Sequence, residues 1–135
     1  MKPATVLLVD DEEDIRRSTA QSLQLAGFCV GDFAAAEAAL DYVTPGFNGV
    51  VVSDIRMPGM DGMTLLSRVH DIDADLPVIL VTGHGDVQLA VRAMREGAYD
   101  FIEKPFDTQH LADVAARALD RRGLVLENRL LRAAA

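Results

Sequence analysis

A short β-branched run at residues 50–53, Val-Val-Val-Ser, leads directly into a carboxylate, Asp54. Pro and Gly residues bound the run on both sides, at 45–46 and 58–59, so the segment between them favours a short buried strand. Such a run is typical of a parallel sheet that is covered on both faces. Asp54 then lies at the carboxyl end of a strand, which is the edge where open α/β sheets hold their functional residues.

Four further apolar runs alternate with helical patterns along the chain. We expect strands at residues 5–9, 28–30, 49–53, 77–81 and 99–102. We expect helices at residues 15–26, 32–43, 63–70 and 86–96, and a last helix from residue 108 onward. This alternation predicts an α/β fold, a doubly wound (βα)5 parallel sheet of five strands with right-handed crossovers and an extended last helix.

The chain is acidic, with a formal net charge of −8 over 135 residues. Residues 1–103 contain 7 basic and 17 acidic side chains, whereas residues 104–135 contain 6 and 4. Because binding to phosphate backbones needs a basic surface, we expect no direct nucleic-acid binding by this segment. No run has the length of a membrane span and no signal peptide is evident, so we expect no membrane attachment. The single cysteine, Cys29, indicates a small core residue in a cytoplasmic protein.

Polar side chains follow four of the predicted strands, and the carboxyl ends of parallel strands meet at one edge of a sheet. Asp10 and Asp11 follow the first strand, Asp54 the third, Thr82 the fourth and Lys104 the fifth. Helix capping accounts for the next acidic residues, 12–14, but less well for the two at the strand end. Three crowded carboxylates repel one another unless positive charge lies nearby. Lys104 supplies one charge, and an oxygen-bound Mg²⁺ or Mn²⁺ supplies the rest.

A carboxylate beside a divalent cation and a lysine suits phosphoryl transfer to Asp54, with the Thr82 hydroxyl on a phosphoryl oxygen. The chain has no G-x-G-x-x-G motif, no phosphate-binding P-loop motif and no Ser-His-Asp set, and its three histidines lack metal-ligand spacing. Two alternatives remain. One is a Mg²⁺-dependent phosphatase or phosphotransferase for small molecules, which often has a second Asp where this chain has Arg56. The other is a stand-alone domain that acts by protein binding alone.

The composition changes after about residue 118. Leu119, Leu126 and Leu130 stand at a and d positions of a weak heptad that continues past the predicted sheet domain. This pattern predicts a helix that forms a dimer or leads to a further domain. Gly123 costs roughly 1 kcal/mol in a helix interior, so a break at that residue is the alternative.

Four motifs resemble those of the receiver domain of two-component response regulators, and the resemblance covers about residues 4–120. The motifs are Asp10-Asp11-Glu12, Ser-Asp-Ile-Arg-Met-Pro-Gly-Met-Asp-Gly at 53–62, Val-Thr-Gly-His-Gly at 81–85 and Gly-Ala-Tyr-Asp-Phe-Ile-Glu-Lys-Pro-Phe at 97–106. The resemblance implies a flavodoxin-like fold in which Asp54 accepts a phosphoryl group from a sensor histidine kinase. It also implies a Mg²⁺ site formed by Asp10 or Asp11 with Asp54 and the main-chain carbonyl of Arg56.

The same resemblance implies roles for three further residues. Thr82 is the switch hydroxyl, and Lys104 binds the phosphoryl group, with a cis peptide bond between Lys104 and Pro105. Phe101 occupies the switch aromatic position, where many family members have Tyr. A receiver is a signalling domain rather than an enzyme, and it catalyses at most its own phosphorylation and dephosphorylation.

The Gly-His-Gly turn, residues 98–106 and residues 126–130 resemble one subgroup, the sigma-54-dependent (NtrC-type) transcriptional activators, and above all the regulators of C4-dicarboxylate transport. In this subgroup the receiver precedes an AAA+ ATPase and a DNA-binding domain. Its last helix continues into a coiled-coil linker that holds a dimer. We therefore expect a receiver at 1–120, a linker at 121–135 leading to an effector region, and a homodimer formed through the last helix and the linker.

Overall fold

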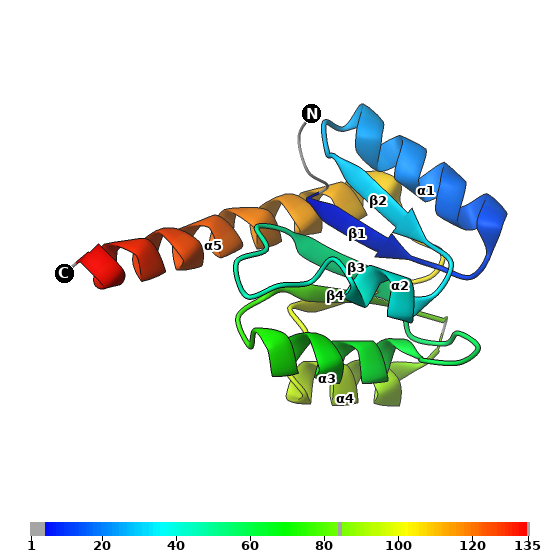
Figure 1. Cartoon of the computed structure of the whole chain (residues 1–135). Helices are drawn as coiled ribbons and strands as arrows, with labels where there is room; N and C mark the ends of the chain where they lie inside the picture. Colours follow the sequence, from blue (N-terminus) through cyan, green and yellow to red (C-terminus); the bar gives the residue numbers. More distant parts are fainter. Residues whose placement is uncertain (1–4, 84, 135) are drawn as a thin grey trace.

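Five parallel strands form one sheet in the order β2-β1-β3-β4-β5, with helices on both faces (Figure 1). This computed structural model describes residues 5–83 and 85–134. The strands are β1 (Val6–Val9), β2 (Val30–Phe33), β3 (Val50–Asp54), β4 (Val78–Thr82) and β5 (Asp100–Glu103). The helices are α1 (Glu13–Leu25), α2 (Ala36–Leu40), α3 (Gly62–Ile72), α4 (Val87–Arg95) and α5 (Thr108–Ala134). The predicted fold class is confirmed, and one predicted turn residue, His84, lies outside the described residues.

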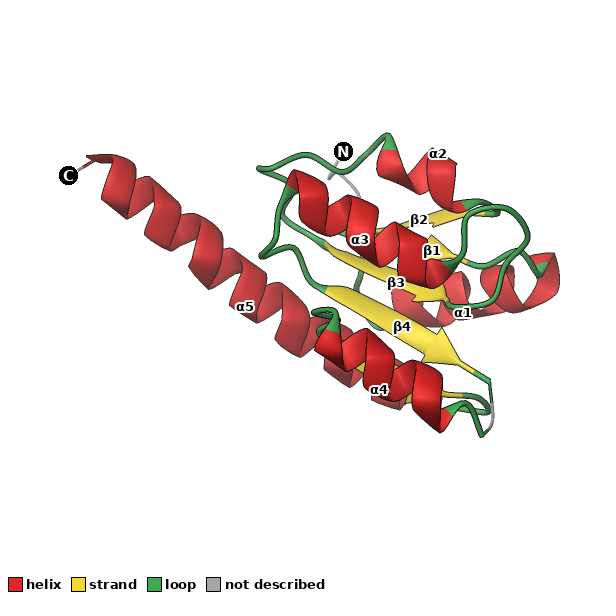
Figure 2. Cartoon of the chain, turned by 90° about the horizontal axis from the view of Figure 1, so that it is seen from below, coloured by secondary structure: helices red, strands yellow, loops and turns green. Residues whose placement is uncertain are grey.

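The helices form two layers. Helices α1 and α5 cover one face of the sheet, and α2, α3 and α4 cover the other (Figure 2). Alternate side chains of each strand face the two layers, because the side-chain period of a strand is two. In β3, for example, Val50 and Val52 pack with α1 and α5, whereas Val51 packs with α2, α3 and α4. Burial on both faces explains why the central strands are continuous apolar runs.

The second strand differs from the predicted one. We expected a strand at 28–30 and a helix at 32–43, but β2 spans Val30–Phe33 and α2 only Ala36–Leu40. Gly27, at φ +102°, ends α1, and the Phe28 amide bonds back to the Leu23 carbonyl at 3.1 Å. The first two residues of the apolar run therefore belong to the connection. At this edge of the sheet, pairing with β1 outweighs the helical propensity of the alanine-rich segment.

The structure also tests three smaller expectations, on the cap of α1, on Cys29 and on Gly123. Glu12 occupies the N-cap position of α1 but makes no side-chain cap bond, and its amide donates to the Asp10 carboxylate at 2.9 Å instead. Cys29 is half-buried rather than a core residue. Helix α5 continues unbroken through Gly123 and projects beyond the sheet (Figure 1). Among the described helices, none combines the length and the apolar character that crossing a membrane requires.

Candidate functional site

Asp54 is the last residue of β3, and its position depends on the close approach of α3. The first residue of α3, Gly62, donates its amide to the Ile55 carbonyl at 2.8 Å. A Cβ atom at Gly62 would collide with the Asp54 carbonyl oxygen and lie 2.8 Å from the Ile55 Cα. Any other residue at this position would push α3 away from the strand end. The Met-Pro-Gly-Met-Asp-Gly segment therefore has a local role, which is to return the chain onto the backbone of Asp54.

Three carboxylates meet at this edge. Asp10, Asp11 and Asp54 each place one oxygen within 4.8 Å of the others. Asp10 and Asp54 are both 6 % exposed, whereas Asp11 faces solvent. Oxygen donors in such a group are the ligands that a hard divalent cation prefers, so the donor set fits Mg²⁺ or Mn²⁺. The two strands that carry these residues are neighbours in register, since Val9 pairs with Ser53.

Lys104 brings a positive charge to the cluster. Its Nζ lies 3.1 Å from both carboxylate oxygens of Asp54. The backbone of Lys104 is fixed by a hydrogen bond from its amide to the Thr82 carbonyl at 2.8 Å. The Lys104–Pro105 peptide bond is cis, as the resemblance implied. The fifth strand thus delivers its lysine to the third strand's carboxylate, fifty residues away in the sequence.

The charges at this edge remain unbalanced. Burial raises the pKa of Asp54 to about 6, and the negative charge of Asp10 adds to the rise, although the hydrogen bond from Lys104 opposes it. Burial alone would lower the pKa of Lys104, but the hydrogen bond and charge of Asp54 outweigh it and raise that pKa. One lysine does not compensate three carboxylates. The site therefore favours the arrival of a cation.

Thr82 and Phe101 lie on the opposite face of the sheet from these groups. Thr82 ends β4 and is 2 % exposed. Phe101 pairs with Leu80 in register, and Leu80 packs on the α2–α4 side, so alternation places Thr82 and Phe101 on that side as well. The Phe101 side chain is 38 % exposed, and α4, which covers the same face, exposes Val87, Val91 and Met94. The predicted switch pair therefore shares one face of the sheet.

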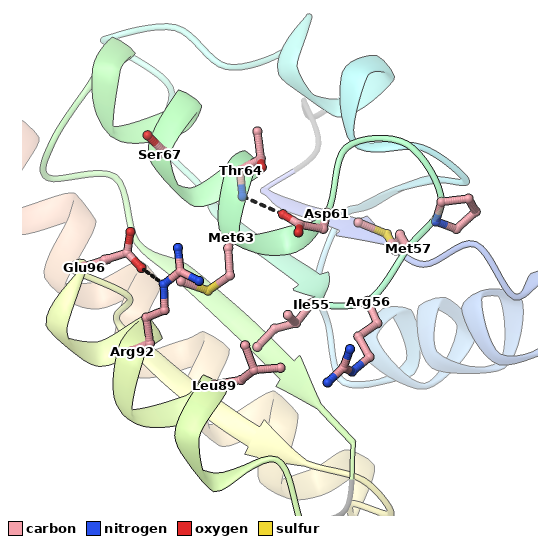
Figure 3. Close-up of a pocket in the computed structure, with 11 residues that line it drawn as sticks. Ile55, Arg56, Met57, Asp61, Met63, Thr64, Ser67, Leu89, Arg92 and Glu96 are labelled. Atoms are coloured by element: carbon pink, nitrogen blue, oxygen red, sulfur yellow. Dashed lines mark hydrogen bonds and ion pairs between the residues drawn. The ribbon is translucent and has the colours of Figure 1, made fainter.

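Arg56 follows Asp54 by two residues, and its side chain turns away from the cluster. Its guanidinium pairs with Asp86 at 3.2 Å, and this hydrogen bond raises the pKa of Arg56. An open cavity of about 710 Å³ lies beside it, between the loop after β3, α3 and α4 (Figure 3). Figure 3 shows an ion pair between Arg92 and Glu96 on its far side. None of the three clustered aspartates lines this cavity, although Arg56, whose main-chain carbonyl belongs to the predicted metal site, does.

A second groove, of about 620 Å³, is lined in part by Lys104. Its lining is mostly apolar and includes Ile15 of α1 with Pro105 and Phe106 from the loop after β5. Ile15 is 38 % exposed, although it belongs to the helix stripe that sequence periodicity would place in the core. An exposed apolar surface thus adjoins the charged site.

The predicted dimer residues differ in how far their own domain covers them. Leu119 packs against the α1–α5 side of the core, Leu126 is half-buried and Leu130 is exposed. Arg122 of the same helix is fully buried and pairs with Asp73, a role that the sequence analysis did not predict. One signal was available, because Arg122 continues the i, i+4 and i, i+3 spacing of the buried residues Leu111, Ala115 and Ala118.

Comparison with known proteins identifies the family. The family model of the response regulator receiver domain matches residues 6–116. The C4-dicarboxylate transport transcriptional regulatory protein DctD of Rhizobium meliloti is 53 % identical over 131 residues, and that of Pseudomonas aeruginosa is 57 % identical over 129. These alignments cover 97 % and 96 % of this chain but only 28 % of each relative.

A solved structure of Brucella abortus NtrX in complex with ATP superposes with a TM-score of 0.82 at 39 % identity, over 96 % of this chain and 30 % of that one. The amino-terminal domain of FixJ superposes with a TM-score of 0.79 at 46 % identity, over 89 % of this chain and 96 % of that one. With its aspartate cluster, its lysine and its matched sequence, the chain belongs to the receiver domains of two-component response regulators.

Proposed function

We propose that Asp54 accepts a phosphoryl group from a phosphohistidine of a sensor histidine kinase. The observation that carries this proposal is the buried Asp54 carboxylate, which contacts Lys104 at 3.1 Å and faces two further aspartates. A carboxylate oxygen of Asp54 attacks phosphorus, the phosphorus–nitrogen bond breaks, and the departing imidazole nitrogen takes up a proton. The product is an acyl phosphate on Asp54.

The aspartate cluster fits a Mg²⁺ ion, for which Mn²⁺ is a substitute. Asp10, Asp11, Asp54 and the main-chain carbonyl of Arg56 would hold the ion, and the ion neutralises charge on the transferring phosphoryl group when bound. Lys104 stabilises a second side of that group through its ammonium. A side chain at position 56 that points toward Asp86 leaves the approach to Asp54 clear, and it offers no second carboxylate for turnover of small phosphate esters. We therefore propose a signalling domain and not a phosphatase.

The phosphorylated form rearranges the face that carries Thr82 and Phe101. Phosphorylation adds about −1.5 to −2 charge at Asp54, and the buried Thr82 hydroxyl is drawn toward a phosphoryl oxygen. The half-exposed Phe101 ring then turns inward on the same face of the sheet. Because Phe101 lacks a phenol hydroxyl, packing alone drives its movement.

The apolar groove beside Lys104 is the proposed docking surface for the kinase segment that bears the phosphohistidine. Ile15, Pro105 and Phe106 supply apolar contact, and the groove leads directly to the Lys104 side chain. A partner bound at this surface brings its histidine to the phosphoacceptor without crossing the α4 face. The surface that binds the kinase, beside Lys104, is therefore separate from the α4 face that changes on phosphorylation.

The output leaves through α5. We propose a receiver at 1–120 and a coiled-coil linker at 121–135, with a homodimer that involves Leu119, Leu126 and Leu130. The exposed Leu130 is available to a second copy, while the partial burial of Leu119 concentrates the contact toward the end of the helix. Since the curated relatives are much longer transcriptional regulators, the linker is proposed to lead to an AAA+ ATPase and a DNA-binding domain that act with sigma-54 in the cytoplasm.

The test is phosphoryl incorporation from a small phosphoryl donor, acetyl phosphate, with Mg²⁺, measured by intact-protein mass spectrometry. Asp54→Asn is expected to abolish incorporation, because an amide cannot form the acyl phosphate. Asp61→Asn is the matched control, since Asp61 caps α3 through the Thr64 amide and lies outside the cluster. Full incorporation into Asp54→Asn would show that the phosphoacceptor is another residue.

A further inference from the structure

Two arginines of α5, seven residues apart, bind the same buried carboxylate. Asp73 follows the end of α3, and its side chain is only 4 % exposed. Arg122 donates from Nη2 to Asp73 Oδ2 at 2.8 Å. Arg129 binds in the bidentate manner, with Nη1 to Oδ2 and Nη2 to Oδ1, both at 2.8 Å. We call Asp73, Arg122 and Arg129 the Asp73 clamp.

The clamp also reaches the connection between α2 and β3. Arg122 donates from Nε to the Phe47 carbonyl at 2.9 Å and from Nη2 to the Pro45 carbonyl at 3.1 Å. Arg129 donates to the same Pro45 carbonyl at 3.1 Å. The clamp therefore joins three segments at the amino-terminal edge of the sheet, opposite the phosphoacceptor. Charge-assisted hydrogen bonds of this kind are stronger than neutral ones, and the planar guanidinium group of Arg129 matches the geometry of a carboxylate.

Gly123 lies between the two arginines. The residue is the weakest point of α5, because glycine stabilises helices less than any residue except proline. A Cβ atom at this position would meet no atom within 4 Å, so packing does not require a glycine there. Residues 122 and 129 are two helical turns apart and therefore lie on one face of the helix. A single carboxylate thus holds α5 on both sides of Gly123.

We propose that the Asp73 clamp is a hinge lock that keeps α5 straight across Gly123 and sets the direction in which the linker leaves the receiver. Without the outer arm, the helix beyond Gly123 loses the side-chain hydrogen bonds and ion pairs that the described residues show between it and the rest of the domain, and short helical ends fray in water. Arg122, Asp73 and Arg129 are positioning residues in this proposal. The proposal rests on the proposed function only for its consequence, which is that the linker transmits the phosphorylation signal.

The direct test is amide hydrogen exchange of residues 124–128, whose helical acceptors lie at 120–124 across Gly123. Arg129→Met removes the outer arm but leaves the buried pair between Arg122 and Asp73. Exchange at 124–128 is expected to accelerate about tenfold or more. Arg132→Met, which removes an exposed charge from the same helix end, is expected to change exchange by less than about twofold. Equal exchange in wild type and Arg129→Met would overturn the hinge lock.

The rescue variant separates a hinge from a simple loss of stability. Gly123→Ala, combined with Arg129→Met, is expected to restore slow exchange at 124–128, because alanine stiffens the helix where the space is open. The charge and the contacts of Arg129 stay absent in the double variant. Failure of this rescue would place the weak point elsewhere and overturn the proposed hinge.

The signalling consequence is tested by sedimentation with and without beryllium fluoride, which mimics a phosphoryl group on Asp54. Wild type is expected to change its association state, Arg129→Met to lose most of that change, and the double variant to regain it. A change that persists in Arg129→Met would overturn the transmitting role of the clamp. No change in wild type would contradict the proposed function, whereas hydrogen exchange would still decide the hinge lock.

Discussion

Two aspartates at opposite edges of the sheet are buried to a similar degree, but their surroundings shift their pKa values in opposite directions. Asp54, at the carboxyl end of β3, is 6 % exposed, and Asp73, just before β4, is 7 % exposed. Burial raises the pKa of Asp54 to about 6, and the negative charge of Asp10 adds to the rise, although the hydrogen bond from Lys104 opposes it. The hydrogen bond from Arg129 holds the pKa of Asp73 well below its usual range despite burial, and Arg122 adds to this effect.

The difference shows how one fold assigns two tasks to the same residue type. A carboxylate that is over-compensated by two guanidinium groups is fixed in place and inert. A carboxylate that is under-compensated stays ready for a cation and for a phosphoryl group, at a cost in stability. The sheet separates the two edges, so the reactive charge does not weaken the contact that holds α5.

Asp73→Ala is expected to give the largest effect. It leaves Arg122 fully buried without a carboxylate, and breaking a buried pair in this way costs about 3–5 kcal/mol of unfolding free energy. Urea unfolding at pH 7 measures the loss. The control is Asp75→Ala, since Asp75 is an exposed residue whose side chain accepts from the outer arginine, Arg129, and we expect a loss below about 1 kcal/mol. Equal losses in the two variants would remove the contrast between buried and exposed partners.

Asp54→Asn is expected to act in the opposite direction. Without Mg²⁺ at pH 7, the amide removes a buried charge and its repulsion from Asp10, at the cost of the contact with Lys104. A pKa raised to about 6 corresponds to a gain of roughly 1–3 kcal/mol in unfolding free energy. The same urea experiment measures it. A clear loss would mean that Lys104 already balances the cluster, and the comparison of the two edges would then fail.

The reactive edge, the carboxyl end of the sheet with Asp54 and Lys104, could be predicted from the sequence because its residues follow strands with clear apolar patterns. Asp54 ends a β-branched run, and Lys104 stands in a motif with local spacing, so topology alone brings them together. The edge strand β2 was misplaced by two residues, because Phe28 is apolar for a reason unrelated to strand pairing. It packs against the core from a connection. Apolar runs locate central strands better than edge strands, which bury less of each residue.

The Asp73 clamp could not be predicted in the same way. Asp73 and Asp75 stand in an acidic, loop-like segment, and Arg122 and Arg129 in the basic end of a helix, where solvated side chains are the ordinary expectation. The pairs join residues that lie 49 and 56 positions apart, and no periodicity connects them. Only the position of Arg122 in the buried stripe of α5 distinguished it from the surface arginines. Contacts between a helix and distant loops depend on tertiary structure, which local patterns do not encode.

Added Mg²⁺ is expected to stabilise the reactive edge alone. A ligand that binds only the folded state adds about 1.4 kcal/mol at ten times its dissociation constant. Thermal unfolding with increasing MgCl₂ measures this gain in wild type. Asp11→Asn is expected to lose most of it, since the exposed Asp11 contributes one oxygen to the cluster. Asp75→Asn, an exposed carboxylate at the other edge, serves as the control and is expected to keep the full gain. A gain of equal size in both variants would indicate non-specific salt effects.

The smallest expected effect is on the pH dependence of the unfolding free energy, to which Asp54 and Asp73 contribute with opposite sign. In the folded state the pKa of Asp54 is raised above its usual value of 3.8, so the folded state binds more protons than the unfolded state between about pH 4 and 6. The unfolding free energy therefore falls as the pH rises through that window, by about 1 kcal/mol per pH unit. Asp73 has a lowered pKa, so its contribution is complete above about pH 4 and is lost as the pH falls further. Urea unfolding across pH 3–7 without Mg²⁺ measures both limbs. Asp54→Asn is expected to flatten the limb between pH 4 and 6 while it keeps the acid limb. If the variant and wild type run parallel through that window, Asp54 does not titrate there, and the reactive edge is as well compensated as the clamp.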